Sequence, residues 1–142
     1  MTYATLQPLI DRHGEQLLLQ LTDRAVPPQG AIDTGVVDQA LANTDAVIDG
    51  YLAGRYVLPL AAVPPLLADL ALAIAIYKLH VYSPEAKIAD DYKAAMAELD
   101  KIASGKIRLP LAGVEPAASG STGVETIDRD RPLTPENLRG FI

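Results

Sequence analysis

Apolar residues recur three or four positions apart over two long stretches of the chain, residues 34–53 and residues 84–104. This spacing places them on one face of an α-helix, so the pattern predicts two long amphipathic helices. The apolar positions are Val37, Ala40, Leu41, Val47, Ile48, Tyr51 and Leu52 in the first helix, and Ile88, Tyr92, Met96, Leu99 and Ile102 in the second.

Residues that favour helix ends flank both stretches. Asp33 or Thr34 can cap the first helix. Ser83 is expected to cap the second helix, with Pro84 at its first helical position. The glycines expected to end the two helices are Gly54 and Gly105.

Two shorter helices are predicted before these, over residues 5–13 and 15–22, on either side of Gly14. Thr5 is the expected N-cap of the first one. Residues 23–33 contain two prolines and a glycine, so this stretch is expected to form a loop.

A fifth helix is expected over residues 65–82, after an apolar linker at residues 55–65 that contains several prolines. Its side chains are apolar on almost every face, and Asp69, Lys78 and His80 are the interruptions. Such a helix is normally buried in a core or between subunits. Burial is favoured over a membrane span because the run falls short of the roughly 20 apolar residues that a span needs.

The composition changes after residue 110. Residues 111–123 are rich in Ala, Gly, Ser and Pro, which indicates a flexible linker. Residues 124–142, at the end of the chain, contain four large apolar residues. Burying these four side chains does not offset the conformational entropy that the stretch would lose if it folded by itself. We expect this stretch to dock on a neighbouring subunit or partner; packing on its own core, or no fixed position, is an equal alternative. These apolar residues are Leu133, Leu138, Phe141 and Ile142.

The chain is therefore predicted to be all-α, with about five helices in residues 1–110 and a flexible C-terminal tail in residues 111–142. Two of the helices are short and N-terminal, and three are longer. The low aromatic content of 5% agrees with helix over sheet. The N-terminus has no basic region followed by an apolar stretch, so no signal peptide is expected and the chain should start in the cytoplasm.

Charge and composition exclude several functions. The net charge is −6 and the Lys and Arg residues form no basic stripe, so sequence-specific nucleic-acid binding is not expected. The chain has no Cys, and its two histidines, His13 and His80, are far apart. Asp90 and Asp91 are neighbours on a helix and do not face each other. We interpret His80 as a helix residue with a backbone or water partner, and expect no catalytic residue, no cofactor and no metal site.

One segment is more distinctive than the helices around it. Residues 48–60 resemble the signature of a protein family from the head region of Mu-like phages and related prophages, and the run Gly-Tyr-Leu-Ala-Gly-Arg-Tyr at residues 50–56 is its discriminating part. Further matching stretches are residues 3–5, 21–23, 63–66, 102–107, 130–134 and 138–141.

This resemblance implies a connector-type helical bundle and a non-enzymatic structural protein of the virion. The implied role is a head-to-tail connector subunit of the neck, which forms a ring of about a dozen copies on the portal protein and contacts tail or neck proteins. Assembly would take place in the cytoplasm of the bacterial host, and the isolated chain could be monomeric. Two alternatives stay open: a head- or tail-completion protein, and a small helical regulator of a host protein.

The distinctive segment has a structural and a functional interpretation. In the first, Tyr51 and Tyr56 pack in the core while Arg55 pairs with a carboxylate or with carbonyl groups. In the second, Arg55 anchors a protein interface. The candidate interface residues are Tyr51, Arg55 and Tyr56, together with Leu133, Leu138 and Phe141 of the tail.

Overall fold

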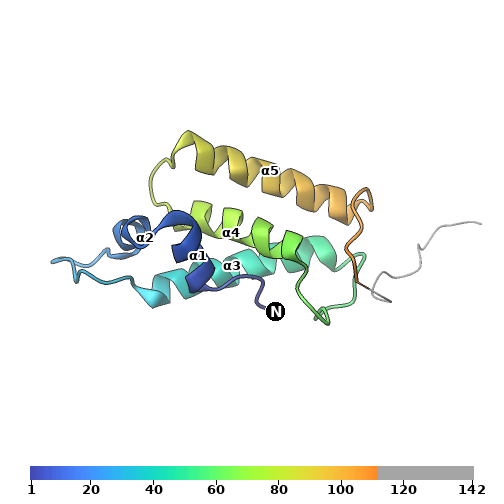
Figure 1. Cartoon of the computed structure of the whole chain (residues 1–142), viewed down its shortest axis with the longest axis horizontal. Helices are drawn as coiled ribbons and strands as arrows, with labels where there is room; N and C mark the ends of the chain where they lie inside the picture. The colour runs from blue at the N-terminus through green and yellow to red at the C-terminus, as the bar shows by residue number, and fades with distance from the viewer. Residues whose placement is uncertain (112–142) are drawn as a thin grey trace, which may run out of the picture.

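The computed structural model describes residues 1–111, which fold into five α-helices and no strand. The helices are α1 (Leu6–His13), α2 (Glu15–Thr22), α3 (Thr34–Leu52), α4 (Pro65–Leu79) and α5 (Ala86–Ala103). The three longer helices lie side by side and alternate in direction, while α1 and α2 pack at one end (Figure 1). The all-α prediction with two short and three longer helices is confirmed. The linker and tail predicted at residues 111–142 lie outside the described residues, except for Leu111.

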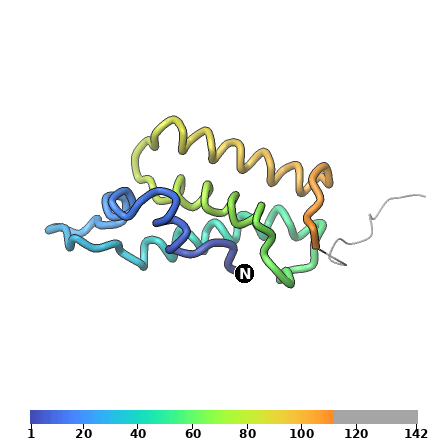
Figure 2. Tube along the Cα trace, viewed as in Figure 1, coloured from blue at the N-terminus to red at the C-terminus, as the bar shows by residue number. Residues whose placement is uncertain are grey.

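Helix α4 packs against both α3 and α5, as the trace in Figure 2 also shows. Neighbours on two sides bury apolar side chains around most of its circumference, which is why its sequence lacks a broad polar face. Its buried residues are Leu67, Leu70, Ala71, Ile74, Ala75, Ile76 and Leu79. The prediction of a buried helix is therefore confirmed. Within residues 1–111, none of the helices combines the length and the hydrophobicity that crossing a membrane requires.

The predicted end of α4 was three residues too late, because α4 ends at Leu79. The Nδ1 atom of His80 donates to the carbonyl oxygen of Ile76 at 2.7 Å, and Arg24 donates from Nη2 to the carbonyl oxygen of Leu79 at 3.0 Å. These side chains take carbonyl groups that a continuing helix would use, and the backbone of His80 is extended. The expected backbone partner of His80 is present, but the expectation that His80 is a helix residue was wrong, because it follows the end of α4.

The predicted start of α5 was also wrong, by two residues. The helix begins at Ala86 and its N-cap is Glu85, not Ser83, so Pro84 precedes the helix. Glu85 has an extended backbone, and its carbonyl oxygen accepts from the N–H of Ala89 at 3.1 Å. The chain has to cross from the end of α4 to α5, and this crossing keeps the residues before Ala86 out of the helix.

Asp33 caps α3. Its side chain accepts hydrogen bonds from the N–H groups of Gly35 and Val36 at 3.0 and 3.4 Å, so of the two predicted caps Asp33 is the correct one and Thr34 is the first helical residue. Thr5 occupies the predicted N-cap position of α1, but its side chain makes no capping hydrogen bond.

Candidate functional site

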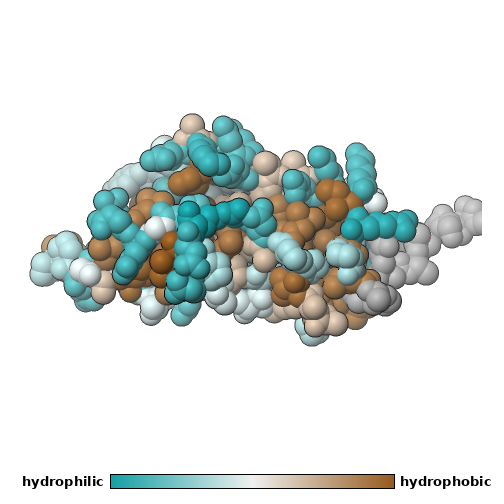
Figure 3. All heavy atoms as spheres, viewed as in Figure 1, coloured by the Kyte–Doolittle hydropathy of each residue, from teal (hydrophilic) through white to brown (hydrophobic). Residues whose placement is uncertain are grey.

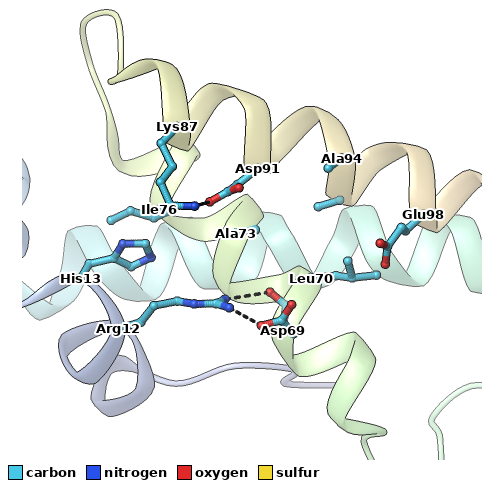
Figure 4. Close-up of a pocket in the computed structure, with 11 residues that line it drawn as sticks. Arg12, His13, Asp69, Leu70, Ala73, Ile76, Lys87, Asp91, Ala94 and Glu98 are labelled. Carbon is cyan, nitrogen blue, oxygen red and sulfur yellow. Dashed lines mark hydrogen bonds and ion pairs between the residues drawn. The ribbon is translucent and has the colours of Figure 1, made fainter.

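A polar cleft of about 320 Å³ lies between α1, α4 and α5 (Figure 4). One side is formed by Arg12 and His13, the last two residues of α1, and the others by Asp69 of α4 and by Lys87 and Asp91 of α5. The cleft therefore gathers charged residues from parts of the chain that are far apart in sequence.

Arg12 joins α1 to α4. Its guanidinium forms an ion pair with the carboxylate of Asp69 and donates from Nη1 to the main-chain carbonyl oxygen of the same residue at 3.3 Å. The two side chains are 41% and 58% exposed. Because exposed ion pairs contribute about 0–1 kcal/mol, this pair orients α1 more than it stabilises the fold.

Lys87 and Asp91 form a second ion pair along α5, with Nζ and Oδ2 3.0 Å apart. They are four residues apart, so they lie on the same face of the helix. Asp91 and its neighbour Asp90 both have exposed side chains.

His13 is half-buried at the C-terminal end of α1, and its Nε2 atom is buried without a hydrogen-bond partner. Burial lowers the pKa of His13, and the nearby guanidinium of Arg12 lowers it further, while the carboxylate of Asp91 acts in the opposite direction. The imidazole is therefore neutral at neutral pH.

The charged groups of the cleft are mostly paired with each other. Among residues 1–111, no group of three or more His, Asp or Glu side chains is placed to hold a metal ion. This arrangement holds α1 against the pair of helices α4 and α5 through the contacts between Arg12 and Asp69.

A second cluster joins two stretches about fifty residues apart in sequence. Gly105 has a φ of +81°, and a Cβ atom at this position would lie 2.5 Å from Cζ of Arg55. The Tyr56 hydroxyl accepts a hydrogen bond from the N–H of Leu109 at 3.1 Å. The segment at the end of α3 thus holds the segment that follows α5.

The positive φ of Gly105 belongs to the end of α5. The N–H of Lys106 donates to the carbonyl oxygen of Lys101 at 2.9 Å, and the N–H of Gly105 donates to that of Ile102 at 3.1 Å. This hydrogen-bond pattern is the Schellman motif, which places a glycine in the left-handed region. The prediction that Gly105 ends the helix is confirmed.

Tyr3 fixes the N-terminal segment to α3. Its hydroxyl donates to the carboxylate of Asp49 at 2.5 Å and its N–H donates to Asp45 at 3.0 Å. Burial raises the pKa of Tyr3, and the hydrogen bond to Asp49 raises it further. Burial also raises the pKa of Asp45, although the hydrogen bond from Tyr3 opposes this.

Three of the six candidate interface residues lie within the described part of the chain. Tyr56 is buried with 3% exposure, while Tyr51 and Arg55 are half-buried. Both tyrosines pack against the core, as the structural interpretation expected. An interface role for these residues stays a prediction. The other three candidates, Leu133, Leu138 and Phe141, lie outside the described residues.

Sequence reasoning missed an apolar groove of about 360 Å³ at the end of the molecule that carries α2. Val81 and Tyr82 are 62% and 88% exposed there, beside half-buried Leu21. Figure 3 shows hydrophobic side chains reaching the surface at this end. The sequence placed Val81 and Tyr82 inside the apolar helix. The available signal was Ser83, which precedes a proline and therefore favours an extended backbone.

Comparisons with known proteins extend over the whole chain. Residues 3–127 match the family described as "Bacteriophage Mu, Gp36". The chain is 33% identical to "Gene product J" of Escherichia phage Mu over 142 residues, which is all of both chains. It is 34% identical to "Mu-like prophage FluMu protein gp36" of Haemophilus influenzae over 140 residues, covering 99% of this chain and 98% of the relative.

Proposed function

This chain belongs to the bacteriophage Mu Gp36 family, and we propose that it is a non-enzymatic structural subunit of the virion, a head-to-tail connector that assembles on the portal protein. The observation that carries the proposal is the agreement with phage Mu gene product J from end to end. A relationship over the full length favours a shared role for the whole chain over a shared helical fragment.

The charge of the chain agrees with this role. A connector surrounds a channel through which the genome passes, so its subunits should not hold DNA phosphates tightly. Tight phosphate binding needs clustered Lys and Arg residues. The net charge of this chain is −6, and in the polar cleft Arg12 and Lys87 are paired with carboxylates.

The internal contacts of the bundle agree with a subunit that folds before it assembles. Tyr3, Arg55, Tyr56 and Gly105, all from stretches that resemble the family, make contacts within the chain. These four residues thus contribute to a bundle that folds by itself.

The test is the native mass of the full chain, measured alone and mixed with the portal protein of the same phage. We expect a ring of many copies, or co-migration with portal, in the mixture. A chain that stays monomeric in both samples at high concentration would overturn the connector role. In that case binding of a tail protein or a host protein would be measured next, because the completion and regulatory alternatives predict those partners.

A further inference from the structure

The groove at the end that carries α2 has no cover within residues 1–111. We propose that it receives residues 133–142 of a second copy of this chain, an inference that rests on the proposed assembly into a ring. Leu21, Val81 and Tyr82 line the groove together with the polar residues Gln20, Arg24, His80 and Ser83. Apolar surface that is exposed in a hollow commonly marks a binding site for another chain.

The conformation of the linker between α4 and α5 keeps this surface open. The chain leaves the helix at His80 because two side chains take its last carbonyl groups, and Val81 and Tyr82 then project with 62% and 88% exposure. Within the described residues, no ring partner covers Tyr82, whereas Tyr77 and Tyr92 stack on each other with their ring centroids 3.9 Å apart. An exposed aromatic residue beside a half-buried leucine offers an apolar side chain a place to pack.

The proposed occupant is the apolar stretch at residues 133–142. It contains Leu133, Leu138, Phe141 and Ile142, and four such side chains do not offset the cost of ordering the stretch alone. A preformed groove on another chain would supply the missing apolar contacts. The groove thus has exposed apolar surface, and residues 133–142 have apolar side chains that they cannot bury by folding alone.

The place where the described chain ends favours a second copy as the source of this segment. The segment that follows α5 lies at the opposite end of the molecule from the α4–α5 linker (Figure 1). A head-to-tail arrangement would bring this end of one bundle toward the groove of the next copy. Head-to-tail contacts of this kind produce closed rings when the rotation between copies closes. Residues 112–132 are long enough to reach back along the bundle, so docking within one chain is the alternative that the double-cysteine variant below detects.

Charge is compatible with the same match. Arg24 lines the groove, and its guanidinium donates to the carbonyl oxygens of Leu21 and Leu79. No carboxylate lines the groove. Residues 133–142 carry one acidic residue, Glu136, and one basic residue, Arg139, so the occupant is neutral overall and Glu136 is its carboxylate for pairing with Arg24.

Disulfide trapping tests the proposal directly, because the natural chain has no cysteine. One full-length preparation carries Tyr82→Cys and a second carries Phe141→Cys. The two preparations are mixed and oxidised mildly. Portal protein is added if the natural chain needs it to assemble. The matched control replaces the first variant by Ala42→Cys, an exposed position on α3 outside the groove. We expect a mixed disulfide dimer of positions 82 and 141 at several times the yield of positions 42 and 141.

Equal yields in the two mixtures would overturn the proposal. So would a double variant, Tyr82→Cys with Phe141→Cys, that forms its disulfide within one chain at high dilution and gives no mixed dimer. A second readout uses Phe141→Asp against Ser121→Asp, which adds the same charge to the linker. Only the first variant is expected to lower the apparent affinity between copies, by about tenfold or more; equal affinities would contradict the docking.

The native mass of the natural chain separates this inference from the proposed function. If the natural chain assembles with portal while the trapping yield stays at the control level, the connector role stands and the docking is wrong. If the natural chain remains monomeric with portal, the connector role fails. The trapping yields at the same concentrations then still decide whether the tail of one copy reaches the groove of another.

Discussion

The guanidinium group of Arg55 occupies the space in which a side chain at position 105 would begin, and Gly105 has the positive φ that ends α5. Two requirements therefore meet at one glycine. The backbone at position 105 needs a residue that tolerates the left-handed region. The guanidinium of Arg55 leaves no room for a Cβ atom at this position. This relationship ties the distinctive segment at the end of α3 to the end of α5.

Gly105→Ala is expected to lower the free energy of unfolding by about 1–3 kcal/mol, because the left-handed backbone alone costs an alanine about 1–2 kcal/mol and strained backbone costs about 1–3 kcal/mol. Chemical denaturation of the full chain measures it. The control is Gly54→Ala, where no atom lies within 4 Å of the added Cβ and φ is ordinary. Adding Arg55→Ala to Gly105→Ala should give a loss smaller than the sum of the single losses. Strict additivity would show that the two positions do not interact.

Tyr56→Phe is expected to destabilise the fold by about 1–3 kcal/mol, because it leaves the buried N–H of Leu109 without its acceptor. The segment after α5 should also lose protection in amide hydrogen exchange. Tyr92→Phe is the matched control, since it keeps the ring that stacks on Tyr77. If both variants unfold at the same denaturant concentration as the natural chain, the hydrogen bond to Leu109 contributes nothing.

Asp33→Ala removes the side chain that accepts from Gly35 and Val36 at the start of α3. A lost N-cap costs about 0.5–2 kcal/mol, and the thermal unfolding midpoint should fall accordingly. Thr34→Ala changes the adjacent residue without removing the cap and should leave the midpoint nearly unchanged. A larger effect at Thr34 than at Asp33 would reverse the assignment of the cap.

The stability of the bundle should fall as the pH is lowered below about 6.5, the ordinary pKa of histidine. The folded chain lowers the pKa of His13 through burial and through Arg12, so in the pH range between the folded and unfolded pKa the unfolded chain binds more protons than the folded chain. The stabilisation from His13 is therefore complete above the unfolded pKa and is lost as the pH falls toward the folded pKa.

Denaturation midpoints of the natural chain and of His13→Asn, measured from pH 7.5 to pH 5.5, check this expectation. The variant lacks the titrating group and should show a smaller decline over that range. The carboxylate of Asp91 faces His13 and weakens the effect, so Asp91→Asn should steepen the decline. Parallel curves for the natural chain and His13→Asn would remove His13 as the cause.

The sequence alone determined the helical class and most helix boundaries. The spacing of apolar residues revealed α3 and α5, and the loops before α3 and α4 followed from prolines and glycines. These features are local: a turn of helix places residues three and four apart on one face whatever the rest of the chain does. The distinctive run at residues 50–56 likewise indicated the phage family, which the comparisons established.

Tertiary structure decided what depends on distant residues. The end of α4 at Leu79 depends on Arg24, which lies 55 residues earlier and takes its carbonyl oxygen, and no local pattern contains that information. The cleft between α1, α4 and α5 and the contact of Arg55 with Gly105 have the same origin, because long-range packing sets which side chains meet. The groove beside Tyr82 exists because α4 stops early, and so a candidate binding surface arose from a contact that sequence spacing could not reveal.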